Sequence, residues 1–403
     1  MGMFFQNEQH EEFGTWPLAY IPYGGADFGE IEAVGQAVAD GDDAAFYGAW
    51  VDIGDRLVAD AAAALAAGRI SSARELYLRA SAYYSSAYHP LYGAPTDPRL
   101  VAAFDKQITA FDAGLGLGPH PMTQMRIPYR DTTLPGYLIP APGFEERRRP
   151  TIVFTNGYDA TVTDMYFASA VAALRRGYHC LLFDGPGQGE LLYKQGIPMR
   201  PDWETVVTPV VDAAMLAPIV DADRLVLSGW SLGGHLAPRA ASGEHRFAAV
   251  VADPGGWSIA DSMRAFAGAM GASPESLDNL DQVPDEVFDK MSSIVESNPS
   301  MKWRIIERGF WVNGVSDMRS FVEASLAYTL DGIGGQISCP ILVTAAENDV
   351  LAAGAGRFVD ELGDRATLIR FTAAEGAGGH CEMTNRTLLN RRVLDWLDGV
   401  LGA

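Results

Sequence analysis

Cysteine is scarce in this chain. Among its 403 residues there are three, Cys180, Cys339 and Cys381. They are too few and too scattered for a disulfide framework or a zinc site, and an odd number without a bridging pattern is typical of a reducing compartment. We therefore expect neither disulfides nor a bound metal, and we expect the protein to reside in the cytoplasm.

Positive charge is also in short supply. Lysine and arginine total 30 against 51 aspartates and glutamates, which gives a formal net charge of −21. Such a surface repels phosphate backbones and anionic lipids, which argues against nucleic acid and membrane surfaces as partners. No apolar run approaches the roughly 18 residues of a transmembrane helix. The N-terminal segment MGMFFQNEQHEEF lacks the basic and apolar regions of a secretory signal.

Apolar residues make up 48% of the chain, which is enough for a large buried core. Residues 1–42 contain several prolines and glycines and predict an extended lead-in. The next segment predicts a helical hairpin over 43–68 and from Ser71 or Ser72 to 89, followed by a helix over 97–113. The tyrosines of the second helix are expected to pack inside the protein or at a subunit interface rather than to line a pocket; they are Tyr77, Tyr83, Tyr84 and Tyr88.

The pattern changes after a linker rich in glycine and proline at 114–121. Two alternating segments, 123–130 and 133–140, predict a β-hairpin. Short apolar runs then alternate with helical segments, which predicts an α/β fold with a mostly parallel sheet and helices on both faces. These runs are 151–157, 180–187, 224–231, 248–255, 341–349 and 367–376.

The interval between the fourth and fifth of these runs is out of proportion. Its roughly 85 residues are too many for a simple crossover, and they predict an inserted helical cap. We therefore expect an N-terminal helical domain, a core in two parts and a cap. In that order they cover residues 1–118, residues 119–255 with 339–403, and residues 256–338.

The pentapeptide Gly229-Trp230-Ser231-Leu232-Gly233 fits the pattern G-x-S-x-G. It follows an apolar run and opens a helical segment, which is the context in which this pattern places a serine hydroxyl on a sharp turn above a sheet. Side chains at the two glycine positions would crowd such a turn. Ser231 is therefore the candidate nucleophile.

A serine hydroxyl near neutral pH needs a base, and the base needs an acid that orients it. In a sheet of this kind the chain order is serine, acid, histidine. The candidate base is His380, in a glycine-rich loop after the last apolar run. His235 and His245 fall on or just after the helix that follows Ser231, which predicts packing or surface roles for them.

Two carboxylates compete for the role of the acid. Asp349 ends the run 341–349, where a turn after a strand can direct a side chain toward the catalytic edge of the sheet. Glu347 is the alternative, and either residue could belong only to the turn. We favour Asp349 because it lies beyond the strand.

The third requirement is a pair of donors for the oxyanion that develops during acyl transfer. One is expected to be the backbone amide of Leu232, at the N-terminus of a helix. The other is expected from the loop after the first apolar run, from the amide of Tyr158 or, as the alternative, of Gly157. The glycine-rich turn 184–190 lacks the spacing of a phosphate or dinucleotide site, so we expect no nucleotide cofactor and expect Asp184 to brace this loop.

The motifs NGYDAT, FDGPGQGE, GWSLGG, AEND and EGAGGHCEM resemble the α/β-hydrolase superfamily over roughly 120–403. Nearly the whole chain is similar to one subgroup, which includes 2,6-dihydroxypseudooxynicotine hydrolase and fungal polyketide-shortening hydrolases. The resemblance implies a triad of Ser231, Asp349 and His380, cleavage of a carbon–carbon bond next to a ketone, and a homodimer. Other similar proteins are carboxylesterases or peptidase-like enzymes, so the motifs indicate the machinery and not the substrate.

The residues that contact the substrate are predicted with alternatives. The nicotine-pathway enzyme resembled here uses an additional acidic residue, for which Asp253 and Asp159 are the candidates, and Trp230 is a further candidate for substrate binding. Large apolar side chains of the cap predict either an apolar, aromatic pocket or the core of the cap itself; they are Met291, Trp303, Phe310, Trp311 and Met318.

These expectations lead to one main function. We expect a serine hydrolase that needs no cofactor and forms an acyl-enzyme with a small, largely apolar or aromatic carbonyl compound. One alternative is a cyclase, acyltransferase or lyase that uses the same triad in a biosynthetic pathway. The other alternative, a non-catalytic binding protein on this fold, fits poorly with three catalytic residue types in the expected order.

Overall fold

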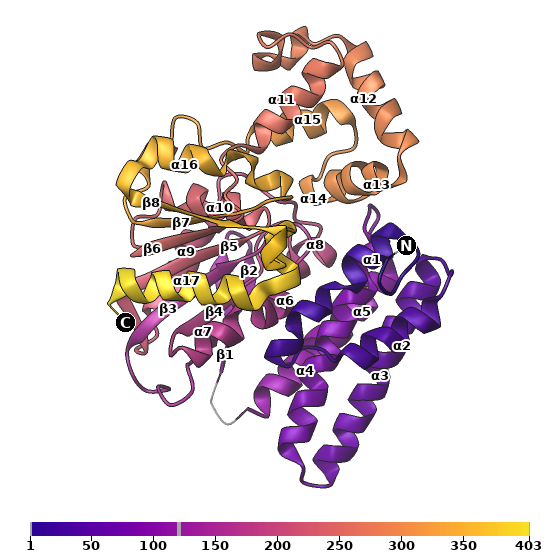
Figure 1. The fold of residues 1–403 in the computed structure, drawn as a ribbon, viewed down its shortest axis with the longest axis vertical. Coiled ribbons are helices and arrows are strands. Elements are labelled where there is room, and N and C mark those ends of the chain that lie inside the picture. The colour runs from indigo at the N-terminus through magenta and orange to yellow at the C-terminus, as the bar shows by residue number, and fades with distance from the viewer. Residues whose placement is uncertain (1, 119–121, 403) are drawn as a thin grey trace.

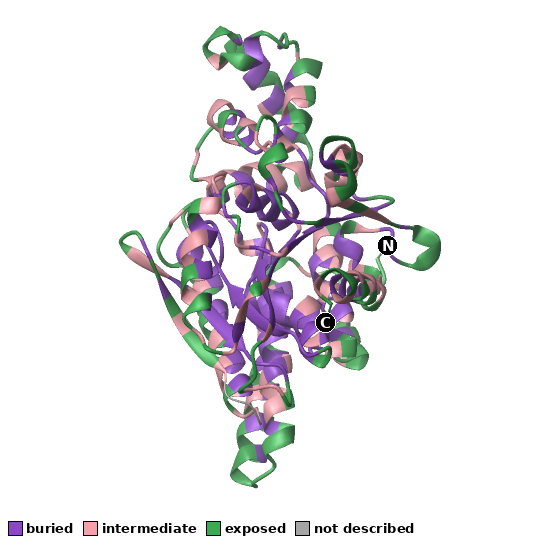
Figure 2. Ribbon diagram, turned by 90° about the vertical axis from the view of Figure 1, so that its left-hand side faces the viewer, coloured by how far each residue is buried: buried purple, intermediate pink, exposed green. Residues whose placement is uncertain are grey.

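The structure is a computed structural model that describes residues 2–118 and 122–402. A central sheet carries helices on both faces, a group of N-terminal helices lies at its lower right in the view of Figure 1, and a helical cap lies at the top. Buried residues concentrate in the sheet and the helices against it, whereas exposed residues dominate the two far ends of the molecule (Figure 2). The mostly parallel α/β architecture expected from the sequence is confirmed.

The sheet has eight strands in the order β1-β2-β4-β3-β5-β6-β7-β8. The first two strands form the expected hairpin, β2 runs antiparallel to β4, and the remaining neighbours are parallel. The strands are β1 Thr123–Tyr129, β2 Thr132–Ile139, β3 Arg149–Thr155, β4 His179–Phe183, β5 Val220–Trp230, β6 Ala249–Asp253, β7 Ile341–Ala346 and β8 Ala366–Phe371. Each apolar run of the sequence therefore corresponds to one strand.

Two hydrophobic cores lie on the two faces of this sheet, because successive side chains of a strand point to opposite faces. In β3, Val153 belongs to one core, and Ile152 and Phe154 belong to the other. The first face is covered by α9 Glu204–Met215, α10 Gly233–Ala241 and α16 Ala355–Leu362, and the second by α6 Val162–Met165, α7 Val171–Arg175 and α17 Arg386–Leu401. The short helix α8 Gly189–Tyr193 follows β4.

The N-terminal segment differs from the expectation at its beginning. Residues 1–42 were expected to be extended, but they form α1 Glu8–Gly14, a 3-10 helix over Trp16–Tyr23 and α2 Phe28–Val38. Side chains begin both α-helices, since Asn7 accepts the amides of Gln9 and His10, and Asp27 accepts that of Gly29. The prolines and glycines that suggested an extended chain fall in and around the 3-10 helix, where they interrupt the helices without preventing them.

The helical hairpin and the third helix form as expected. They are α3 Asp43–Ala66, α4 Ile70–Ala87 and α5 Pro98–Gly116. The expected start of the second helix at Ser71 or Ser72 is wrong, because the helix begins at Ile70 after Arg69, without a side-chain cap. Tyr83, Tyr84 and Tyr88 of this helix are buried in packing.

The expected linker at 114–121 is only partly a linker. Helix α5 continues through its first residues to Gly116, because Leu115 extends the buried face of the helix. The last three residues of the linker, and with them the expected start of the core at 119, lie outside the described residues. The division of the chain into domains at these boundaries stays a prediction.

The expected cap is helical. It contains α11 Ile259–Ala269, α12 Asp285–Ser297, α13 Pro299–Met301, a π-helical segment over Lys302–Phe310, α14 Trp311–Asn313 and α15 Met318–Leu326. Its two connections to the core are paired with each other, because Ser258 and Thr329 form an antiparallel bridge and the Ile259 amide donates to the Tyr328 carbonyl at 2.9 Å. Among the described residues, no helix has both the length and the apolar character needed to cross a bilayer.

Candidate active site

Ser231 lies on a sharp turn between β5 and α10. Its backbone is in the left-handed region with φ +60°, which a serine adopts only when its surroundings enforce it. The Ser231 amide donates to the carbonyl of Asp253 at 2.7 Å. A Cβ at Gly229 would lie 1.8 Å from the Gly233 carbonyl oxygen, and one at Gly233 would lie 2.6 Å from the Thr155 carbonyl oxygen. The two glycines of the pentapeptide are therefore required by the close approach of the chain.

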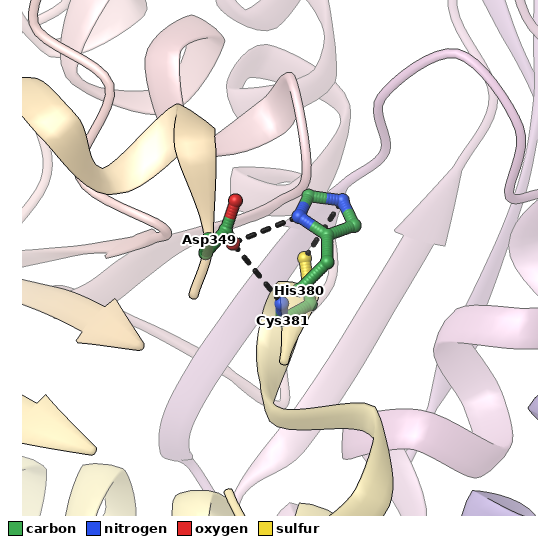
Figure 3. A group of neighbouring side chains, drawn as sticks. All are labelled: Asp349, His380 and Cys381. Atoms are coloured by element: carbon green, nitrogen blue, oxygen red, sulfur yellow. Dashed lines mark hydrogen bonds and ion pairs between the residues drawn. The ribbon is translucent and has the colours of Figure 1, made fainter. Parts of the chain in front are cut away.

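The structure brings Ser231, His380 and Asp349 together in one chain of hydrogen bonds. Ser231 Oγ lies 2.9 Å from His380 Nε2, and His380 Nδ1 lies 2.8 Å from Asp349 Oδ2. Figure 3 shows the Asp349 carboxylate directed at the near edge of the imidazole ring. The side chain of Asp349 is 1% exposed, whereas that of His380 is 42% exposed. The acid is therefore buried behind a base that faces an open space.

The charges of this pair alter both pKa values. Burial alone would lower the pKa of His380, but the hydrogen bond and negative charge of Asp349 outweigh it and raise this pKa above its ordinary value. Burial alone would raise the pKa of Asp349, but its bond to His380 and the amides of Leu351 and Cys381 hold this pKa below the usual range. Asp349 thus stays ionised and favours the protonated imidazole.

The alternatives to these residues lie elsewhere. The carboxylate of Glu347 accepts the amide of Ala373 at 2.8 Å on the exposed side of the turn. His235 is buried, its Nδ1 lies 2.9 Å from the Gly256 carbonyl oxygen, and burial lowers its pKa to about 4. His245 is exposed. These two histidines occupy the packing and surface positions expected for them.

The loop after β3 lies directly against the nucleophile turn. A Cβ at Gly157 would lie 2.7 Å from the Leu232 amide nitrogen and 3.0 Å from the Ser231 Cβ. Within the described part of the chain, the amides of Leu232, Gly157 and Tyr158 have no hydrogen-bond partner. The predicted donor Leu232, and both Tyr158 and its alternative Gly157, therefore have amides available to a bound oxygen atom. Asp184 braces this loop as expected, since it accepts the Asn156 side-chain amide at 3.0 Å.

A cavity of about 670 Å³ opens above Ser231 and His380, a size that suits a small organic substrate. The core contributes the triad with Leu232, Tyr158 and Asp159 to its lining. Trp16 lines it from the N-terminal helices, and Ile259, Arg304 and Arg308 line it from the cap. All three parts of the chain therefore enclose the same space.

Two of the predicted substrate-binding residues do not reach this cavity. Asp253 is buried below the site, where it accepts hydrogen bonds from Thr344 and Arg386. Trp230 is buried, and its ring packs against the ring of Trp16. The Arg386 guanidinium lies 5.5 Å from the centre of the Trp230 ring. Both side chains are buried and lie outside the lining of this cavity. Asp159 does line the cavity.

The large apolar residues of the cap do not line the cavity either. Met291 and Met318 belong to the core of the cap, and Phe310 packs against it. Trp303 and Trp311 pack on the core and the N-terminal helices. The residues that sequence analysis missed are Arg304 and Arg308, whose four-residue spacing in a π-helical segment places both at the cavity.

Asp349, His380 and Cys381 have donor atoms within 4.8 Å of one another, a spacing compatible with a metal ion (Figure 3). Burial, reinforced by the charges of Asp253 and Asp349, raises the pKa of Cys381 well above its ordinary value. A thiol in that state is a poor metal ligand, because the thiolate is the binding form. The imidazole and the carboxylate also bind each other, so this chemistry does not fit a metal.

The sequence and the fold have counterparts among known proteins. A family model described as "Alpha/beta hydrolase family" matches residues 152–389, which is more than half of the chain. The chain belongs to the α/β-hydrolase family. The family expected from the motifs is thus confirmed, and the chain is an enzyme of the hydrolase class. Fungal relatives and one solved structure confirm the expected subgroup as well.

Relatives of this α/β-hydrolase match it over nearly its full length. It is 32% identical to "Hydrolase LUC6" of Fusarium sp over 407 residues, covering 96% of this chain and 94% of the relative. It is 31% identical to "20-hydroxy-prefusarin hydrolase FUS2" of Gibberella moniliformis, covering 94% of each. The crystal structure of 2,6-dihydroxy-pseudo-oxynicotine hydrolase superimposes with a TM-score of 0.73 at 18% identity and covers 95% of each chain, which shows a shared fold.

A buried charged cluster lies beneath the active-site cavity of this α/β-hydrolase. Arg386 Nη1 donates to Asp253 Oδ2 at 2.8 Å and to the Cys381 carbonyl oxygen at 2.7 Å. Glu382 is fully buried next to this pair, close to the Asp253 carboxylate. Burial, reinforced by the charge of Asp253, raises the pKa of Glu382 to about 11. Glu382 is therefore protonated at neutral pH. Arg386 connects the loop that carries His380 to β6, the strand next to β5.

Proposed function

We propose that this α/β-hydrolase is a serine hydrolase in which Ser231 is the nucleophile, His380 the base and Asp349 the acid that orients it. The observation that carries the proposal is the unbroken chain of hydrogen bonds from Ser231 Oγ through His380 to Asp349, at 2.9 and 2.8 Å. It lies at the floor of the cavity that all three parts of the chain enclose.

The first half of the reaction forms an acyl-enzyme. His380 Nε2 takes the proton of the Ser231 hydroxyl while Oγ attacks the substrate carbonyl carbon, and the carbonyl oxygen becomes an oxyanion. The amides of Leu232 and Tyr158, with Gly157 as the alternative, donate to that oxyanion. Asp349 stabilises the imidazolium. The tetrahedral intermediate then collapses, and the leaving group departs with the proton from His380.

The second half releases the acid product. Water gives a proton to His380 Nε2 and attacks the acyl carbon, a second oxyanion forms at the same amides, and Ser231 leaves with the proton. The leaving group of the first half is an alkoxide or amine for an ester or amide. For a carbon–carbon bond next to a ketone it is an enolate, which is stable enough to leave and is protonated on carbon. The resemblance of the motifs supports this last class.

The lining of the cavity adds to the description of the substrate. Trp16, Ile259 and other apolar side chains form part of the wall, and the arginine side chain of Arg304 forms another part. We propose a small carbonyl compound with an apolar or aromatic body that also carries polar groups. Asp159 is the remaining acidic candidate at the cavity wall, and Asp253 is no longer one.

The nucleophile is tested by Ser231→Ala. The variant should hydrolyse a p-nitrophenyl ester at least about 10⁴-fold more slowly than the wild type, with an unchanged melting temperature. A fluorophosphonate should label the wild type at Ser231 and leave the variant unlabelled. Equal turnover by both proteins would overturn the proposal.

Labelled water tests whether the reaction is hydrolysis. Turnover in H₂¹⁸O should place one heavy oxygen in the acid product, which mass spectrometry detects. A product without the label would contradict hydrolysis and would indicate transfer or cyclisation through the same serine.

Two further proposals concern the protein in the cell. We propose that it acts as a homodimer, which the resemblance of its motifs supports, and that it resides in the cytoplasm, which its three free, buried cysteines fit. Light scattering at micromolar concentration should give a mass of about twice 43.3 kDa. A monomer mass at that concentration would contradict the dimer.

A further inference from the structure

The loop that carries the proposed second oxyanion donor, the amide of Tyr158, is held by the cap through two side chains. Arg308 Nη1 donates to Asp159 Oδ2 at 2.7 Å, and Asn313 Nδ2 donates to the Tyr158 hydroxyl at 2.7 Å. The Arg308 guanidinium also lies 5.4 Å from the centre of the Tyr158 ring and 5.1 Å from that of Trp303. The cap thus contacts both residues that follow Gly157.

The N-terminal helices hold the same loop from another side. The Tyr92 hydroxyl donates to the Asp159 carbonyl oxygen at 3.1 Å, and His89 Nε2 lies 3.3 Å from that oxygen. Core residues hold its beginning, because Gln188 Nε2 donates to the carbonyl oxygens of Asn156 and Gly157 at 2.7 and 3.1 Å. The loop is therefore a junction between all three parts of the chain.

We propose that Arg308 is a positioning residue of this site, which acts by holding Asp159 so that the Tyr158 amide stays in place to bind the oxyanion. The proposal rests on the proposed function. The contact of the cap with the core thereby completes the oxyanion hole, in addition to covering the cavity.

The burial of the pair explains why its loss would move the loop. The side chains of Arg308 and Asp159 are 15% and 12% exposed. Two of their atoms, Asp159 Oδ1 and Arg308 Nε, are buried and have no hydrogen-bond partner among the described residues. Removing the guanidinium leaves a carboxylate that is buried and unpaired, which is strongly unfavourable. Asp159 would then turn toward water and carry the adjacent Tyr158 amide with it.

A positioning role predicts a specific kinetic signature. Loss of one well-placed oxyanion donor lowers kcat by roughly 10²–10³-fold, so displacement of the Tyr158 amide in Arg308→Gln should lower kcat about 10- to 100-fold. KM should change less than about threefold, because the bound ester makes little use of this donor. Because the charge of Asp159 contributes to the raised pKa of His380, kcat should be compared on the plateau of the pH profile, where this imidazole is neutral in both proteins.

Reversible inhibitors separate positioning from substrate binding. A trifluoromethyl ketone adds to Ser231 and places an oxyanion in the hole, whereas the matching methyl ketone binds without this step. In Arg308→Gln the trifluoromethyl ketone should bind at least about tenfold more weakly and the methyl ketone less than about twofold. Equal weakening of both would make Arg308 a substrate-binding residue, and no weakening of either would show that it has no role; both outcomes overturn the proposal.

Matched variants keep this test interpretable. Arg264→Gln removes a partly exposed cap arginine that pairs with Asp278 at 3.1 Å, and it should leave kcat and both inhibition constants unchanged. If Arg308→Gln does not fold, Tyr158→Phe removes only the hydrogen bond from Asn313 and keeps the backbone amide. It should weaken the trifluoromethyl ketone selectively but less, and equal effects on both ketones would overturn the proposal. Fluorophosphonate labelling of wild-type Ser231 reports separately on the proposed function.

Discussion

The imidazole of His380 sets the pH dependence expected of this enzyme. In the proposed mechanism only the neutral ring accepts the Ser231 proton, and Asp349 raises the pKa of His380 above its ordinary value. We expect kcat/KM to rise with pH through a midpoint above about 6.5, measured with a p-nitrophenyl ester in buffers of constant ionic strength.

Asp349→Asn provides the companion measurement. The variant removes the charge that raises the pKa of His380, so the midpoint should shift to lower pH. Activity should fall on the order of 10³–10⁴-fold, because the amide no longer stabilises the imidazolium. A midpoint that does not move in this variant would show that another group titrates.

The protonated carboxyl of Glu382 predicts an unusual stability profile. Its folded pKa of about 11 lies above the unfolded value of about 4.3, so unfolding releases a proton across the range between them. The stability that this group contributes is complete below about pH 4 and declines as the pH rises toward 11. Glu382→Gln should therefore raise the melting temperature more at pH 8 than at pH 5.

Thermal melts over this pH range check the Glu382 prediction. An exposed glutamate of the cap provides the control, and Glu296→Gln should change the melting temperature little at any pH. A lower melting temperature for Glu382→Gln at pH 8 would show that the ionised carboxylate is the stable form.

The sequence predicted which residues meet at the candidate site where their order along the chain and their places after strands determine it. Ser231, Asp349 and His380 were predictable because each follows a strand, and the carboxyl ends of parallel strands meet at one edge of the sheet. Arg308 and Glu382 were not, because their roles depend on which buried group they face. No local sequence pattern distinguishes a cap arginine at the surface from one that contacts the loop after β3.

At the scale of elements, the turn between β5 and α10 leaves no room for a side chain at Gly229. Its Cβ would lie 1.8 Å from the backbone oxygen of Gly233, which cannot move without displacing Ser231. Gly229→Ala should lower the free energy of unfolding by at least about 3 kcal/mol. Urea denaturation followed by circular dichroism measures this loss.

A glycine within a helix is the matched control. Gly48 lies in α3, and a Cβ there would meet no neighbouring heavy atom of the described residues within 4 Å. Gly48→Ala should raise the free energy of unfolding by roughly 0.5–1 kcal/mol, because alanine restricts the unfolded chain and favours the helix. Similar losses in both variants would contradict the steric account of the turn.

Strands and long helices were predictable because each carries its own periodicity. The six apolar runs and the hairpin became β1 to β8, since short buried runs alternating with helices have few other arrangements. The helices within residues 1–42 were missed because they are short and separated by prolines and glycines. The exact start of α4 was missed because serine is a common but not an obligatory first residue.

At the scale of the whole molecule, one aromatic cluster joins the three parts of the chain. Trp303 of the cap lies 5.2 Å from Phe13 and 5.9 Å from Tyr92 of the N-terminal helices, measured between ring centres. Trp311 of the cap stacks on Tyr193 of the core at 5.6 Å. Such contacts stabilise the arrangement of the parts as well as each part.

Trp303→Ala should therefore destabilise the N-terminal helices as well as the cap. Loss of this buried ring should lower the free energy of unfolding by roughly 3–5 kcal/mol, and hydrogen exchange should accelerate in α1 and around Tyr92 as well as in the cap. Phe288→Ala, in the separate core of the cap, is the control and should accelerate exchange in the cap alone. Exchange confined to the cap in both variants would show that the cluster does not couple the parts.

The paired connections of the cap at Ser258 and Thr329 have a consequence for how this enzyme can diversify. The segment between these two residues leaves the core and returns to it at one place. Replacing this segment with the corresponding segment of a relative would keep Ser231, His380 and Asp349 in the core and would exchange the part of the cavity wall that the cap contributes. Recombination at the two neighbouring connections would then change substrate selectivity. The incoming segment would have to supply a basic side chain in the place of Arg308.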